Sequence, residues 1–117
     1  MTTQEKNKAI AEWLGLEVNE LHIGIISAGK WHKHTAGETF VTEFNKWQPD
    51  KDRNQQKLIE DRLIEMKYWI DYNYSPETKL HEFVLWSGID SDDEIIEDSF
   101  DRDTAFIDVI IKLIRSK

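Results

Sequence analysis

The stretch Met66-Lys-Tyr-Trp-Ile-Asp-Tyr-Asn-Tyr-Ser-Pro-Glu-Thr-Lys-Leu-His-Glu-Phe-Val-Leu-Trp86 predicts a β-hairpin. Both arms are rich in β-branched and aromatic residues, and a short turn with Pro76 separates them. The second arm is apolar on both faces, with Leu80, Val84 and Trp86 on one face and Phe83 and Leu85 on the other. A strand of this kind is expected to be covered on both faces, and helical patterns flank the hairpin in the sequence.

Three helices are predicted from apolar stripes with a period of 3.6 residues. The first runs over 3–14, where Thr2 and Glu5 have capping-box spacing and Gly15 marks the end. The second begins near residues 50–52 and ends near residue 66. Asp101 is positioned to cap the third helix, whose stripe comprises Ala105, Phe106, Val109, Ile110, Leu113 and Ile114.

Short strands are expected over 21–27, 31–34 and 39–44, with turns at 28–30 and 36–38, and an edge strand over 94–97. Strands joined by short turns favour antiparallel pairing. The sequence therefore predicts an α+β fold in which an antiparallel β-sheet is packed by three helices. Helices on both faces of the sheet would give a three-layer α-β-α sandwich, and helices on one face would give two layers.

Length and composition predict one domain spanning residues 1–117. No apolar run is long enough for a transmembrane helix, so no membrane association is expected. The polar N-terminus lacks the apolar core of a signal peptide, and cysteine is absent. Both observations favour a cytoplasmic location, and the absence of cysteine excludes disulfide and thiolate chemistry.

The formal net charge of −8 is concentrated in one segment, because residues 90–103 contain eight acids and a single base, Arg102. Its candidate binding residues are Asp90, Asp92, Asp93, Glu94, Glu97 and Asp98. A solvated acidic loop is one interpretation, and a surface that displays phosphate-like charge to a basic partner is another. A calcium loop of the EF-hand type is not supported, since the required Gly and final Glu are missing at their spacing.

A second cluster lies at Lys30-Trp-His-Lys-His34. Trp31 could stack on a base while Lys30 meets phosphate, but a core position for Trp31 is the favoured interpretation, and a charge of −8 repels nucleic acid. On a strand His32 and His34 project from one face, where both could bind a metal if His22, His81 or a carboxylate added a third ligand. No spacing matches a known metal or nucleophile motif, so neither a metal, nor a cofactor, nor a catalytic residue is predicted.

Three parts of the chain resemble a known family. These parts are Asn7-Lys-Ala-Ile-Ala-Glu-Trp-Leu-Gly15, the segment from Phe44-Asn-Lys-Trp47 to Leu63, and the closing Asp103-Thr-Ala-Phe-Ile-Asp-Val-Ile-Ile-Lys112. They are similar to the phage ABA sandwich domain family of small phage and prophage proteins, in which a sheet lies between two helical layers. The resemblance implies a phage or prophage setting, but no established activity and no site residues.

The function predicted from these observations is binding without catalysis. Three classes compete within or against it. The first is an interaction protein that presents the acidic segment to a basic host protein, as an anti-defence protein or a nucleic-acid mimic would. The second is a nucleic-acid binder that uses residues 30–34, and the third is a metal-dependent enzyme that uses the histidines.

Overall fold

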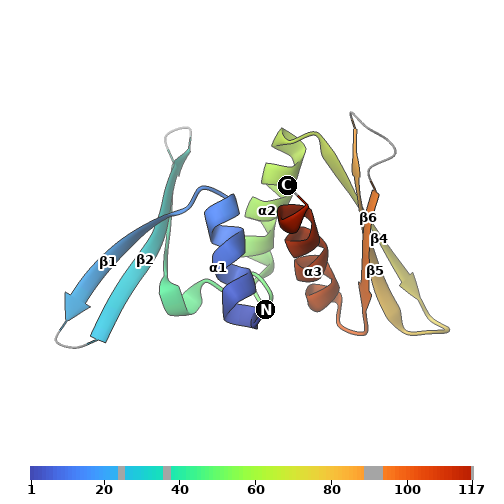
Figure 1. The fold of residues 1–117 in the computed structure, drawn as a ribbon, viewed down its shortest axis with the longest axis horizontal. Coiled ribbons are helices and arrows are strands. Elements are labelled where there is room, and N and C mark those ends of the chain that lie inside the picture. The colour runs from blue at the N-terminus through green and yellow to red at the C-terminus, as the bar shows by residue number, and fades with distance from the viewer. Residues whose placement is uncertain (24–25, 36–37, 89–93, 117) are drawn as a thin grey trace.

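The computed structural model describes residues 1–23, 26–35, 38–88 and 94–116. In these ranges three helices and six strands follow one another, with a short 3₁₀ helix, η1, between β3 and α2 (Figure 1). Their order is α1 (Thr3–Trp13), β1 (Glu17–Ile23), β2 (Ile26–Thr35), β3 (Glu38–Glu43), η1 (Phe44–Lys46), α2 (Arg53–Glu65), β4 (Tyr68–Ser75), β5 (Leu80–Ser87), β6 (Glu94–Ser99) and α3 (Arg102–Arg115).

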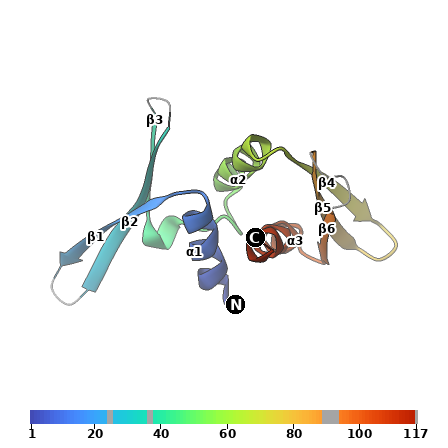
Figure 2. The same ribbon diagram turned by 45° about the horizontal axis from the view of Figure 1, so that its top comes forward.

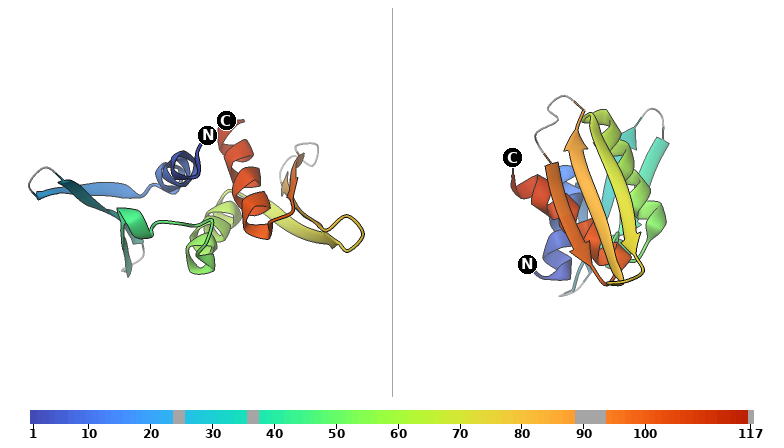
Figure 3. Two further views of the ribbon diagram at one scale, coloured as in Figure 1. Left: turned by 90° about the horizontal axis from the view of Figure 1, so that it is seen from below. Right: turned by 90° about the vertical axis from the view of Figure 1, so that its right-hand side faces the viewer.

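The predicted α+β class with antiparallel strands is confirmed, but the strands form two sheets and not one. Each sheet is a three-stranded meander of sequence neighbours, β1-β2-β3 and β4-β5-β6. The helices lie between the sheets, so the layers run β, α, β and each sheet has one face turned away from the helices (Figures 1 and 3). This order is the reverse of the α-β-α sandwich. In the sequence α2 lies between β3 and β4, and no described strand of one sheet pairs with a strand of the other.

Helix α3 forms the centre of the core. Its residues Ala105, Phe106, Ile107, Val109, Ile110, Ile111 and Leu113 are all buried. The helix packs against β5 and β6 on one side and against α1 on another. Since two neighbours cover it, Ile107 and Ile111 are buried as well as the stripe seen in the sequence, while Ile114 is only partly covered.

The helix ends follow the sequence closely. The Thr2 hydroxyl accepts a hydrogen bond from the Glu5 N–H at 3.1 Å, and Gly15 adopts a φ of +76° after α1. Asp52 caps α2 and Asp101 caps α3 through hydrogen bonds from backbone N–H groups of the first turn.

The turn expected at residues 28–30 is wrong, because these residues lie inside β2. Gly29 pairs with Glu20 across the ladder, and the Phe44 ring occupies the space next to its Cα. A Cβ at position 29 would lie 2.2 Å from Phe44 Cζ. Glycine is therefore present here for close packing and not for a turn.

The cover expected on both faces of β5 is also wrong. The Phe83 and Leu85 side chains are buried on the face towards α3, whereas Trp86, on the other face, is exposed. Figure 3, right, shows β4, β5 and β6 in front of the helices, and none of the other helices and strands of the described residues lies over them.

The molecule is elongated, with extents of 52 × 31 × 23 Å. Its radius of gyration of 15.6 Å exceeds the value of about 13 Å typical of a domain of this length. The first sheet projects away from the helices (Figure 2). Within the described ranges, no helix is both long enough and apolar enough to cross a bilayer.

Candidate binding surface on the second sheet

The uncovered face of the second sheet carries the candidate site. Cross-strand partners share a face, so the register Trp69↔Trp86↔Glu94 places these three residues together. We call this surface the Trp69 face; its residues are Trp69, Asp71, Asn73, Glu82, Val84, Trp86, Glu94, Ile96 and Asp98.

Two tryptophans form its apolar part. Trp69 is 58% exposed and Trp86 is 37% exposed, and their ring centroids lie 6.3 Å apart. The Trp86 Nε1–H donates a hydrogen bond to Asp71 Oδ2 at 3.2 Å, which fixes one ring of the pair. A Cβ at Gly88 would lie 2.6 Å from Trp69 Nε1, so the glycine allows the other ring to lie close to the backbone.

Acidic side chains surround the apolar part. The four acids of the face are Asp71, Glu82, Glu94 and Asp98, and the described residues of the face include no Lys, Arg or His. Glu82 and Asp98 stand directly opposite each other in the ladder, and no ion pair involves either of them in the described part of the chain. Like charges in this position destabilise a sheet, and a cation bound between them would remove that penalty.

A shallow hollow of about 210 Å³ lies at the turn end of the face. Its lining residues include Asn73, Leu80, Glu82 and Asp98. The hollow has room for the end of one long side chain beside the two carboxylates.

The structure divides the acidic residues predicted from the sequence into separate groups. Glu94 and Asp98 lie on the Trp69 face, while Glu97 points to the other face and pairs with Lys112 at 3.3 Å. Asp101 caps α3, and the hydrogen bonds from the Thr104 hydroxyl and N–H lower the pKa of its carboxyl. Asp90, Asp92 and Asp93 lie outside the described residues.

Lys30 and Trp31 do not form a joint site. They are neighbours on a strand and therefore point to opposite faces of the first sheet. Trp31 is only 6% exposed and packs against Phe44 with ring centroids 5.5 Å apart, so it cannot stack on a base. The alternative that places Trp31 in the core is the correct one.

His32 and His34 share a face, as predicted, with ring centroids 6.1 Å apart. His32 Nε2 lies 3.2 Å from a Glu17 carboxylate oxygen, and His34 Nδ1 lies 3.0 Å from the Thr39 hydroxyl. Among residues 1–23, 26–35, 38–88 and 94–116, no three His, Asp or Glu side chains lie close enough together to hold a metal ion.

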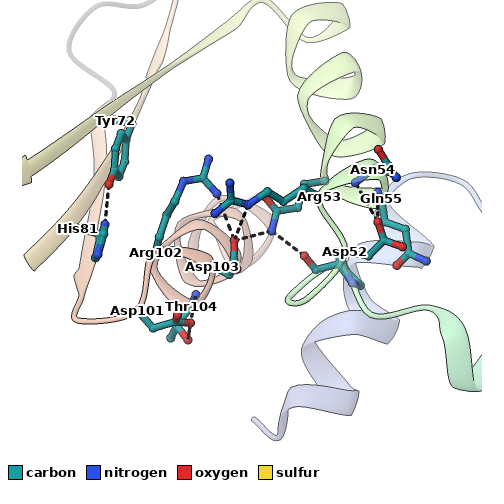
Figure 4. Close-up of polar contacts among 12 residues, drawn as sticks. Asp52, Arg53, Asn54, Gln55, Tyr72, His81, Asp101, Arg102, Asp103 and Thr104 are labelled. Atoms are coloured by element: carbon teal, nitrogen blue, oxygen red, sulfur yellow. Dashed lines mark hydrogen bonds and ion pairs between the residues drawn. The ribbon is translucent and has the colours of Figure 1, made fainter.

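Sequence reasoning missed a polar corner on the inner face of the second sheet (Figure 4). The Tyr72 hydroxyl and His81 Nδ1 lie 2.6 Å apart, and the Arg102 guanidinium lies 5.4 Å from the Tyr72 ring centroid. Arg102 also bonds Asp103 Oδ1 at 3.1 Å, which links the sheet to the start of α3. The alternation in the hairpin places Tyr72 on this face, but the position of Arg102 depends on how α3 docks.

The Trp69 face was visible in the sequence only as an apolar side of β5 that seemed to need cover. The alternation placed Val84 and Trp86 together, but whether another described element covers them depends on the tertiary structure. A scan against protein-family models, a search of curated proteins and a search of solved structures gave no match.

Proposed function

We propose that this protein acts by binding and not by catalysis, and that the Trp69 face docks a basic segment of a partner protein. The observation that supports this most strongly is the combination of an exposed tryptophan pair with four carboxylates on one uncovered sheet face.

The tryptophan pair would supply the affinity. Aromatic side chains dominate binding energies at interfaces because they bury a large area and lose little side-chain entropy. Trp69 and Trp86 keep much of their surface in water, which is unfavourable in a protein that has no partner for them.

The carboxylates would select the charge of the partner. Lysine or arginine side chains next to the tryptophans would meet Glu82 and Asp98 on one side and Glu94 on the other. The acids would also speed association with a basic protein and make binding sensitive to salt. The resemblance to phage proteins suggests a host protein as the partner.

Mimicry of nucleic acid is the competing proposal. It uses the same acids but has no need of the tryptophans, since a phosphate-like surface acts through charge alone. Variants that separate charge from apolar area therefore distinguish the two proposals.

The experiment measures binding of a twelve-residue peptide in which lysine alternates with valine, by calorimetry at low and at high salt. Trp69→Ser should weaken binding by roughly thirtyfold, as expected for a central aromatic anchor. The variant Glu82→Gln, Asp98→Asn should weaken binding at low salt and reduce its dependence on salt.

Two controls accompany the variants. Val41→Ser alters an exposed apolar residue on β3, a strand of the other sheet, and should leave binding unchanged. A peptide with glutamate in place of lysine should not bind. Full binding by Trp69→Ser with loss in the charge variant would support mimicry, and full binding by both variants would refute the docking proposal.

A further inference from the structure

A groove on the other side of the molecule is independent of the Trp69 face. It has a volume of about 860 Å³ and lies between α1, the first sheet and the segment that follows η1. This size falls in the range of small-molecule sites. The residues used below are Asn7 and Lys8 of α1, Val18 of β1, Trp31 of β2, and Phe44 and Trp47.

Asn7 is a buried polar residue in the wall of this groove. It is 6% exposed, and its Oδ1 atom has no hydrogen-bond partner in the described part of the chain. The side-chain Nδ2 donates to Asp50 Oδ1 at 3.0 Å, and the main-chain oxygen accepts a hydrogen bond from Trp47 Nε1 at 2.7 Å.

These partners determine which way the amide faces. Turning it over would place Oδ1 against the Asp50 carboxylate, so the unpaired oxygen must point away from Asp50. A buried acceptor without a donor costs free energy, and most buried acceptors in proteins are paired with a donor. The missing group at this position is an N–H or O–H donor.

The groove also has an aromatic wall. Phe44 is half-buried, and its ring contacts Gly29 and packs against Trp31. The Trp47 Nε1–H donates to the main-chain oxygen of Asn7. Val18, on the strand beside Trp31, is exposed within the same groove. Because Trp31 and Trp47 are buried, a flat apolar ring would meet the Phe44 ring and the Val18 side chain here.

The charges around the groove are nearly balanced. Lys8 and Lys51 oppose the carboxylates of Glu12, Glu20 and Asp50, and the Asp50 carboxylate already accepts a hydrogen bond from Asn7. Among the described residues of the groove there is no cluster of bases for a phosphate or another polyanion, so the balance favours a neutral ligand.

We propose that this groove binds a neutral, planar heteroaromatic ligand whose ring N–H donates a hydrogen bond to Asn7 Oδ1. The Oδ1 atom is covered when the groove is empty, so binding requires movement of a wall side chain. Gln4, Lys8 and Lys51 are long, flexible side chains of the wall that are suited to such movement.

The test compares indole with benzofuran, which has the same shape but carries an oxygen in place of the N–H group. Titrations followed by NMR should show indole binding about three- to tenfold more tightly, the range expected of one neutral hydrogen bond. The Trp47 Nε1–H resonance should shift on binding, since this group is bonded to Asn7.

Asn7→Leu should abolish the preference for indole, whereas Asn45→Leu, which alters an exposed amide of the same groove, should retain it. If Asn7→Leu does not fold, the two ligands titrated into the native protein still decide the matter. Equal affinity for both, or a Trp47 resonance that does not move, would overturn the proposal. Tighter binding of N-acetyltryptophanamide than of indole would identify a tryptophan side chain of a peptide as the source of the ring.

Discussion

Gly29 stands where only glycine fits, but the sequence predicts the wrong reason for it, since a turn was expected and a strand is found. The sequence Ala28-Gly29-Lys30 has turn composition, but the glycine lies within β2 because the Phe44 ring needs the space of its missing side chain. Steric demand from a residue fifteen positions away is not visible in a local pattern. A glycine in a strand therefore has two meanings that only the tertiary structure separates.

The first prediction tests this role. A strand is normally more stable with alanine than with glycine, but Gly29→Ala would place a methyl group 2.2 Å from Phe44 Cζ. We expect a loss of about 1–3 kcal/mol in the free energy of unfolding, as for an overpacked core. Urea unfolding of Gly29→Ala, Phe44→Leu and the double variant measures the coupling. If the double variant loses more free energy of unfolding than the two single variants lose together, steric conflict is not the cause.

At the scale of elements, the helices could be predicted and the first sheet could not. Caps at Thr2, Asp52 and Asp101 depend on residues three or fewer positions away, so the sequence contains the whole signal. Strands β1 and β2 gain their length from pairing with each other, and that information is not local. The same difference explains why Asp101 was correctly identified as a cap while Trp31 remained open to two interpretations.

The second prediction concerns the Asp101 cap. Hydrogen bonds from Thr104 lower the pKa of this carboxyl below its ordinary value of 3.8. The Asp101 carboxyl thus binds a proton less readily in the folded state than in the unfolded state. Its contribution to the stability of the fold is complete above about pH 4 and is lost as the pH falls through the lowered pKa. Asp101→Ala should cost about 0.5–2 kcal/mol near neutral pH.

Asp101→Asn is the matched variant, because the amide oxygen still accepts the bond from Thr104 without a charge. It should retain most of the stability at neutral pH and should show a smaller loss between pH 5 and pH 2. Thermal melts across this range are the measurement. Parallel loss in the native protein and in Asp101→Asn would show that this carboxyl does not contribute to acid sensitivity.

At the scale of the whole molecule, the layer order was beyond the reach of the sequence. Apolar periodicity shows which side of an element is buried, but it does not identify the element that buries it. The apolar stripe of α3 was predicted from the sequence. The position of the helix between a sheet and α1 depends on the packing of all the elements together. The Trp69 face results from this tertiary packing. The apolar pattern of β5 is the same for a face that faces solvent and for one that another element covers.

The third prediction follows from the charge on that face. Since Glu82 and Asp98 oppose each other without a described ion pair, Glu82→Gln should raise the free energy of unfolding by roughly 0.2–1 kcal/mol at low salt. The gain should shrink as salt screens the repulsion. Glu60→Gln on the wet side of α2 is the control and should change little. A loss of stability in Glu82→Gln would show that the carboxylate already has a favourable partner.

The contact between α1 and α3 has a consequence for the way the chain closes on itself. Every described ladder joins strands that are neighbours in the sequence, so the paired residues lie close together along the chain. The ion pair between Lys6 Nζ and Asp108 Oδ1, at 2.6 Å, instead joins residues 102 positions apart. Among the described hydrogen bonds, the one that closes the longest loop therefore lies between the first helix and the last. Parting these two helices would release the beginning of the chain from its end while every strand pair stayed intact.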